Sequence, residues 1–146
     1  MGLLGKLLLG TGELPAEVRA QLEGESLVLV EEGLSGSVRY SHFKAPGKRF
    51  NGKVTAERMG FGISEKRVVV YCRSGRVELI DSAFSSPRLA AVEVTLADEH
   101  KLDIRIDYDE MPDSADVSGE ITVRIKTPRA AVVVDALVSR MPRSHP

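Results

Sequence analysis

The chain has no tryptophan, a single cysteine (Cys72) and a formal net charge of only −1. One cysteine excludes a disulfide within the chain, and its place in a valine-rich run predicts a buried, unreactive thiol. A near-neutral chain is not a generally basic nucleic-acid binder, so we expect no nucleic-acid partner. No apolar run approaches the roughly 18 residues that span a bilayer, and the leucine-rich start is a poor signal peptide. These absences favour a soluble cytoplasmic protein.

The usual signatures of catalysis and metal binding are also missing. The sequence contains no GxSxG elbow and no Walker-type glycine loop, and it offers no serine with a plausible His and Asp. Its three histidines are scattered without metal-ligand spacing. An acidic run lacks the glycine turn and terminal glutamate of an EF-hand loop, which favours a solvated rim over a calcium site. This run comprises Asp107, Asp109, Glu110, Asp113 and Asp116. We therefore expect no enzyme, no cofactor and no metal.

Most of the sequence has the patterning of extended strands. With 146 residues the chain has room for one ordinary domain, and its hydrophobic and charged fractions of 42% and 28% are typical of globular proteins. Residues 60–96 alternate apolar and polar positions between short turns, which predicts an antiparallel meander. Residues 101–108 alternate most cleanly, so one face of that strand must be solvated. Residues 26–41 predict a long first strand bent at its glycines, or two strands.

Two further patterns concern the core and the helices. On the second strand we expect Val54 and Ala56 in the core, together with Met59 and Phe61. Residues 3–9 and 14–22 have apolar side chains at helical spacing. At the other end, Thr127 and the proline after it predict a helix start, and an apolar stripe continues to residue 141. Valine is a poor helix former, so this last helix should depend on burial against the sheet.

These elements predict a mainly β fold. We expect about seven antiparallel strands in two curled sheets that form a partly open barrel, capped by the C-terminal helix. The predicted organisation is a short N-terminal helical arm (1–24), the β domain (25–142) and a tail (143–146).

One segment resembles a known family. Residues 62–71, GISEKRVVVY, are similar to the signature that joins strands two and three in bacterial pleckstrin-homology-like (PH-like) and GRAM-type domains. Gly24-Glu25, the Phe84-x-x-Pro87-Arg88-Leu89 step and Thr127-Pro128 fall in matching places. The resemblance covers residues 24–142 and implies a PH-like fold in a non-enzymatic adaptor or binding module.

A basic stretch between the first two strands is the one candidate ligand site. It contains Lys44, Lys48 and Arg49 in the loop 42–51, with Lys53 and Arg58 alongside. In eukaryotic PH domains that bind phosphoinositides, the phosphates sit at this position. The resemblance therefore implies a site for anionic lipid or phosphate, whereas a charged loop is otherwise usually a solvated surface.

Three functional hypotheses remain. The leading one is protein–protein interaction or self-assembly through strand edges and the leucine-rich arm. The alternative is peripheral binding of anionic lipid or phosphate headgroups through the basic loop, which would place the protein at the inner membrane face. A third is a small apolar ligand enclosed by the curled sheets. The identity of the partner, the oligomeric state and the pathway do not follow from the sequence.

Overall fold

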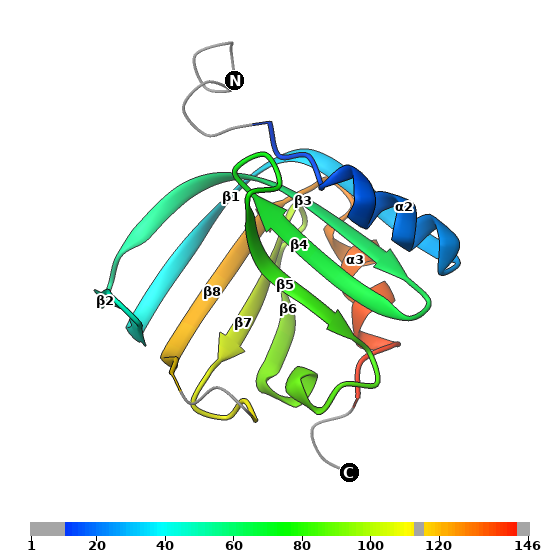
Figure 1. The fold of residues 1–146 in the computed structure, drawn as a ribbon. Helices are drawn as coiled ribbons and strands as arrows, with labels where there is room; N and C mark the ends of the chain where they lie inside the picture. Colours follow the sequence, from blue (N-terminus) through cyan, green and yellow to red (C-terminus); the bar gives the residue numbers. More distant parts are fainter. Residues whose placement is uncertain (1–10, 113–115, 143–146) are drawn as a thin grey trace.

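The computed structural model describes residues 11–112 and 116–142. These residues form two α-helices, one 3-10 helix and eight strands (Figure 1). The helices are α2 (Ala16–Gly24), η1 (Pro87–Ala91) and α3 (Ala130–Val138), and the strands are β1 (Leu27–Ala45), β2 (Lys48–Phe50), β3 (Val54–Ser64), β4 (Arg67–Cys72), β5 (Val77–Ala83), β6 (Val92–Asp98), β7 (Lys101–Asp107) and β8 (Ser118–Lys126). The leucine-rich segment 3–9 and the tail 143–146 lie outside the described residues.

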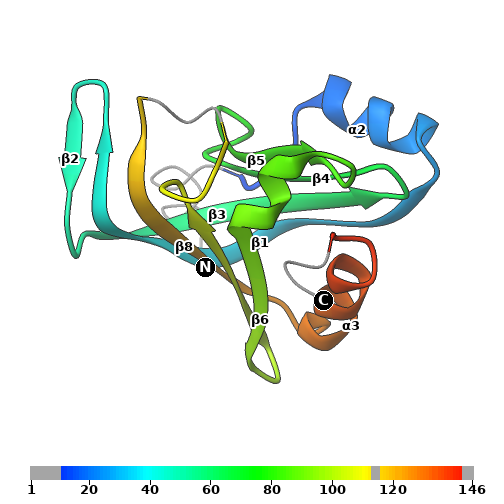
Figure 2. The same ribbon diagram turned by 90° about the horizontal axis from the view of Figure 1, so that it is seen from below.

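All strand pairs are antiparallel and belong to one sheet in the order β5-β4-β3-β1-β8-β7-β6, with the short β2 paired to β1. The sheet curls into a half-barrel, consistent with the PH-like topology that the sequence resembles (Figures 1 and 2). The two curled layers predicted from the sequence are joined into one sheet because β1 pairs with both β3 and β8 along residues 36–39.

The first strand is a single long strand that bends at a glycine, which confirms one of the two predicted alternatives. Its pairing with β3 shifts between Glu31 and Leu34, where Gly33 has a φ of +73°. An extra residue in one strand of a pair bends the strand and strengthens its twist. This bend curls the sheet enough for its two halves to face one another.

The main core fills the concave side of the half-barrel, and α3 covers one end of it (Figure 2). Helix α3 packs against β6 and β7, and its Val133 and Leu137 are buried. Since valines form helices poorly by themselves, burial stabilises this helix as predicted. The Thr127 side chain accepts a hydrogen bond from the backbone N–H of Arg129 at 3.1 Å, although the helix itself begins at Ala130.

Strand β7 has one buried and one solvated face, as predicted from the sequence. Leu102, Ile104 and Ile106 of β7 are buried. On the other face, Asp103 accepts two hydrogen bonds from Arg124 of β8 at 2.8 and 2.9 Å. Because successive side chains of a strand point to opposite faces, the sequence alternation translates directly into one buried and one solvated face.

The predicted core of β3 was partly wrong. Met59 and Phe61 are buried, but Val54 is 52% exposed and Ala56 is also exposed. The even-numbered and odd-numbered residues of one regular strand cannot share a face. The odd-numbered face enters the core, and that face also includes Glu57, a charged residue that is only 4% exposed.

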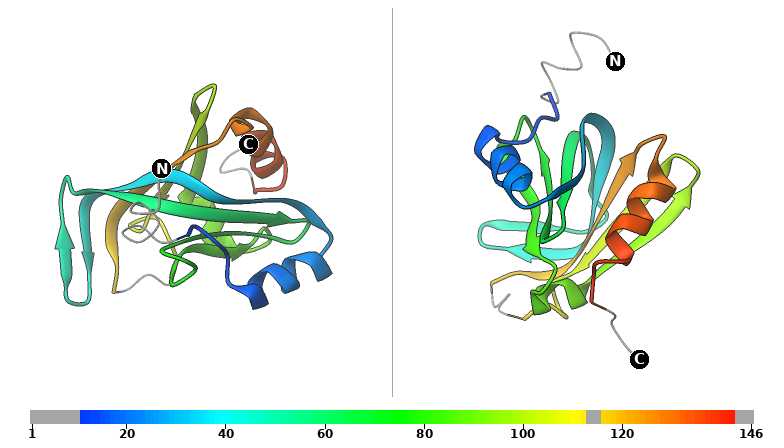
Figure 3. Two further views of the ribbon diagram at one scale, coloured as in Figure 1. Left: turned by 90° about the horizontal axis from the view of Figure 1, so that it is seen from above. Right: turned by 90° about the vertical axis from the view of Figure 1, so that its right-hand side faces the viewer.

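Helix α2 packs on the convex side of the sheet, opposite the main core (Figure 3). Val18 and Leu22, predicted to share a stripe, are buried there with Leu14 against Val69 and Tyr71 of β4. Two glycines of β3 permit this close approach: a Cβ at Gly62 would lie 2.4 Å from Leu22 Cδ1, and one at Gly60 would lie 2.5 Å from a backbone oxygen. The two glycines therefore make room for the N-terminal segment.

Neither of the described α-helices has the length and hydrophobicity that spanning a bilayer requires.

Candidate functional site

The predicted basic loop is largely a β-hairpin, at the end of the half-barrel away from the helices (Figure 2). Lys44 pairs with Arg49, and Ala45 pairs with Lys48. Residues directly opposite in an antiparallel pair share a face, and neighbours along a strand take opposite faces. Lys44 and Arg49 therefore lie on one face of the hairpin, and Lys48 lies on the other.

The four predicted site residues are thus divided rather than gathered. Lys48 and Lys53 line the same pocket, and Lys53 Nζ lies 4.1 Å from the ring centroid of Phe50, a neighbouring lining residue. Lys44 and Arg49 are exposed on the opposite face. Within the described residues, none of the four has a carboxylate within ion-pair distance. Arg58, placed alongside them by the sequence, instead donates to the Gly33 carbonyl oxygen at 2.7 Å.

The pocket beside Lys48 and Lys53, called the hairpin pocket below, has a volume of about 200 Å³. It lies between the hairpin, the inner face of β3 and the start of β5. Its apolar wall includes Val38, which is 1% exposed. The complete lining consists of Val38, Tyr40, Lys48, Phe50, Lys53, Thr55, Glu57, Cys72, Arg73, Val77 and Leu79.

Glu57 and Arg73 form the fixed ion pair of this pocket. Arg73 Nε and Nη2 donate to the two carboxylate oxygens of Glu57 at 3.2 and 3.1 Å. The hydrogen bond and the charge of Glu57 raise the pKa of Arg73. Arg73 belongs to a tight turn in which residues 73–75 all have positive φ, with values of 55°, 60° and 78°. The turn therefore aims the guanidinium back at the sheet, where it compensates the buried carboxylate.

The remaining polar groups of the pocket are neutral. Burial, with a smaller contribution from Glu57, raises the pKa of Tyr40. Burial also raises the pKa of the Cys72 thiol to about 11, which accords with the unreactive cysteine predicted from the sequence. The Thr55 hydroxyl is buried and has no hydrogen-bond partner within residues 11–112 and 116–142. The pocket thus carries three cationic side chains and one carboxylate.

Glu57, Thr55 and Arg73 are candidate-site residues that were not predicted from the sequence. The signal for the first two was present in the alternation of β3, since both have the same parity as Met59 and Phe61. A carboxylate at an odd-numbered position of β3 points into the concave side of the sheet, where burial requires a hydrogen-bonding or cationic partner. Nothing in the local sequence identifies Arg73 as that partner, because their pairing depends on the register of β3 against β4.

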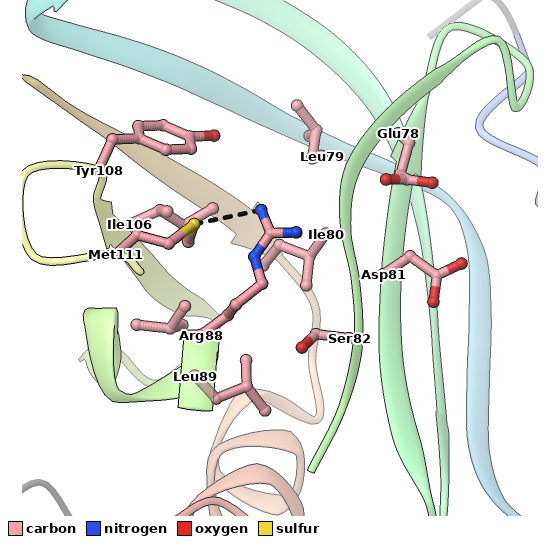
Figure 4. A pocket seen from close by; sticks show the side chains of 11 residues that line it. Glu78, Leu79, Ile80, Asp81, Ser82, Arg88, Leu89, Ile106, Tyr108 and Met111 are labelled. Atoms are coloured by element: carbon pink, nitrogen blue, oxygen red, sulfur yellow. Dashed lines mark hydrogen bonds between the residues drawn. The ribbon is translucent and has the colours of Figure 1, made fainter. Parts of the chain in front are cut away.

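A second candidate surface lies where the half-barrel stays open. Strands β5 and β6 end the sheet, so within the described part of the chain each has one edge without a neighbouring strand. We call the opening between them the seam. A pocket of about 70 Å³ lies in it, lined by β5, η1, β7 and the segment after β7 (Figure 4). In Figure 4 the Arg88 side chain lies among these elements, and its Nη2 is 3.2 Å from Met111 Sδ.

The β6 side of the seam carries exposed apolar side chains. Leu96 of β6 is 48% exposed, and Val132 and Val138 of the adjacent helix α3 are 52% and 54% exposed. Strand β6 pairs regularly with β7 from Val92 to Leu96. The pairing of β5 with β4 is interrupted by a register shift that skips Leu79. The β6 edge is therefore the more regular of the two, and β6 itself packs against α3.

No group of three or more His, Cys, Asp or Glu side chains within residues 11–112 and 116–142 is arranged to hold a metal ion. Asp113, a member of the acidic run, lies outside the described residues.

Comparison with known proteins adds no relative: no family model matches the chain, and no curated protein matches it.

Proposed function

We propose that this chain is a PH-like domain that acts as a non-catalytic interaction module and binds an extended segment of a partner protein along the edge of β6. The observation that carries the proposal is the open seam, in which β6 pairs with β7 on one side and, among the described residues, has no strand on its other side. Unpaired backbone N–H and C=O groups at such an edge are a template for another strand. A strand added there supplies main-chain hydrogen bonds, and pockets for alternate side chains supply specificity.

The side chains around the edge suit an apolar, extended partner. Val92 and Val94 point toward the core and are only partly buried, whereas Glu93 and Thr95 point outward. A partner strand with alternating apolar residues would bury them against Leu96, which is 48% exposed on the same face of β6. Removing that apolar surface from water would favour binding by about 25 cal/mol per Å². The partner is another protein or a second copy of this chain, and in either case a strand of the partner would pair with the edge of β6.

A random-peptide display selection against the immobilised protein tests the proposal. We expect enrichment of peptides with apolar residues at alternate positions. Leu96→Lys should weaken the binding of the selected peptides at least tenfold, because a lysine at a strand edge opposes pairing with another strand. Val54→Lys is the matched control: Val54 is 52% exposed, close to the 48% of Leu96, but it lies on β3, which does not border the seam.

Self-assembly is measured in parallel by light scattering over a range of protein concentrations. A mass that rises with concentration for wild type and for Val54→Lys, but not for Leu96→Lys, would identify a second copy as the partner. The proposal is wrong if no alternating peptide is enriched and the protein stays monomeric, or if both lysine variants lose binding equally.

Binding of anionic headgroups stays a prediction. It is favoured by the absence of a carboxylate partner for the four hairpin cations within the described chain. It is weakened by their division between two faces, since each near-surface cation contributes only about 1 kcal/mol toward an anionic membrane. Sedimentation with anionic vesicles tests it. Lys44→Ala/Arg49→Ala should abolish binding if the exposed face of the hairpin meets the membrane.

A further inference from the structure

The hairpin pocket combines an apolar wall with positive charge that no described carboxylate neutralises. Glu57 is fully engaged by Arg73 through two hydrogen bonds. Lys48 and Lys53 line the same pocket and, within the described chain, have no carboxylate at ion-pair distance. The pocket therefore holds surplus positive charge, which attracts an anion.

One polar group of the lining also lacks a partner among the residues that the structure describes. The Thr55 hydroxyl is buried and makes no hydrogen bond to any of them. Burial of a hydroxyl without a partner is unfavourable, and an acceptor atom that reached it would supply the missing hydrogen bond. An anionic head with oxygen acceptors satisfies both this hydroxyl and the two lysines.

The rest of the wall selects for an apolar body behind that head. Tyr40 and Phe50 pack edge to face with ring centroids 5.1 Å apart, and Val77 and Leu79 complete the apolar side. The volume of about 200 Å³ is below the roughly 300–1,000 Å³ of pockets that hold drug-sized ligands. It suits a single ring or a short chain, and it is too small for a complete lipid.

We propose that the hairpin pocket binds a small amphipathic organic anion: a carboxylate on a short apolar body, with the carboxylate held by Lys48 and Lys53 and the body against Tyr40, Phe50 and the apolar wall. This site is separate from the β6 edge and does not depend on strand addition there. It differs from a headgroup site because the apolar wall is part of the recognition.

The hairpin provides its own matched control. Lys48→Ala/Lys53→Ala removes the two lysines of the pocket and leaves the Arg73–Glu57 pair in place. Lys44→Ala/Arg49→Ala removes the same amount of charge from the opposite face of the same hairpin. All four side chains are exposed, so both double variants should fold, which circular dichroism verifies.

The experiment is a titration with sodium hexanoate followed by amide chemical shifts in ¹⁵N-labelled protein. We expect shifts centred on Phe50, Thr55 and Arg73, with a Kd of about 1 mM, as is ordinary for a ligand of about eight non-hydrogen atoms. Lys48→Ala/Lys53→Ala should weaken binding at least fivefold, and Lys44→Ala/Arg49→Ala by less than twofold. Sodium acetate, which has only the head, and hexanol, which has only the body, should each bind at least fivefold more weakly than hexanoate.

Three results would overturn the proposal. The first is the absence of hexanoate shifts at these residues up to about 10 mM, a concentration that would half-saturate even a very weak site. The second is equal weakening by the two double variants, which would indicate charge attraction to the whole hairpin. The third is tighter binding of inorganic phosphate or inositol trisphosphate than of hexanoate, which would identify a headgroup site without an apolar requirement.

Discussion

Packing of α2 on the convex side of the sheet can be tested at one contact, between Leu22 and Gly62. Leu22 is 0% exposed, and Leu22→Ala removes three buried carbon groups at about 0.8 kcal/mol each, or about 2.4 kcal/mol of transfer free energy. The cavity left behind raises the expected loss of stability to about 3 kcal/mol. Gly62→Ala places a methyl group 2.4 Å from Leu22 Cδ1, and overpacking of this kind costs about 1–3 kcal/mol.

The two changes should compensate one another when they are combined. With Ala at position 22, the methyl group at position 62 enters the space that Leu22 occupied, and a strand glycine replaced by alanine also loses less backbone entropy on folding. We expect the double variant to be more stable than the sum of the single losses predicts, by at least about 1 kcal/mol. Urea unfolding followed by circular dichroism measures all four proteins. Additivity within about 0.5 kcal/mol would show that Leu22 does not lie over Gly62, and would refute the docking of α2.

Three further predictions concern the thiol, the buried ion pair and two glycines. Burial raises the pKa of Cys72 to about 11, so at pH 8 its thiol should react far more slowly with a thiol reagent in the folded protein than in the protein unfolded by urea. A folded-state pKa above the unfolded-state pKa stabilises the folded protein at pH values below the unfolded-state pKa. Urea unfolding should show that this stabilisation is lost between about pH 9 and 11. Arg73→Ala should cost about 1–3 kcal/mol in urea unfolding because it leaves the Glu57 carboxylate buried without its partner, and adding Glu57→Leu should recover part of the loss; no recovery would contradict the pairing. Gly119→Ala should lower the melting temperature much more than Gly47→Ala, although both glycines have positive φ. A Cβ at Gly119 would lie 2.1 Å from a backbone oxygen of β1, whereas a Cβ at Gly47 would meet nothing within 4 Å. Equal losses of melting temperature would contradict this packing.

Local patterns predicted the strands and helices well because each depends on the periodicity of a short segment. The alternation of Leu102, Ile104 and Ile106 determines which face of β7 is buried, and the stripe of Val18 and Leu22 determines the buried face of α2. Both patterns reflect the same geometric rule, since a strand repeats every two residues and a helix every 3.6.

Features that depend on strand register were harder to predict from the sequence. Val54 and Ala56 are apolar, but they share a strand with Met59 and Phe61 at the opposite parity, so composition suggested a core position that geometry forbids. The basic side chains of the hairpin were close in sequence, and the hairpin register separates them onto two faces. The pairing of Arg73 with Glu57 joins different strands, so it became visible only with the fold.

The most direct test of the account is amide hydrogen exchange at the seam, measured at a concentration where the protein sediments as a monomer. In an edge strand, alternate amides point away from the single neighbouring strand and exchange with solvent, whereas a central strand is bonded on both sides. We predict alternating fast and slow exchange along β6 (Val92–Asp98) and slow exchange at successive amides of β1 where it pairs with both β3 and β8. Uniformly slow exchange along β6 in the monomer would mean that this edge is already covered, and would contradict the open seam on which the proposed interaction depends.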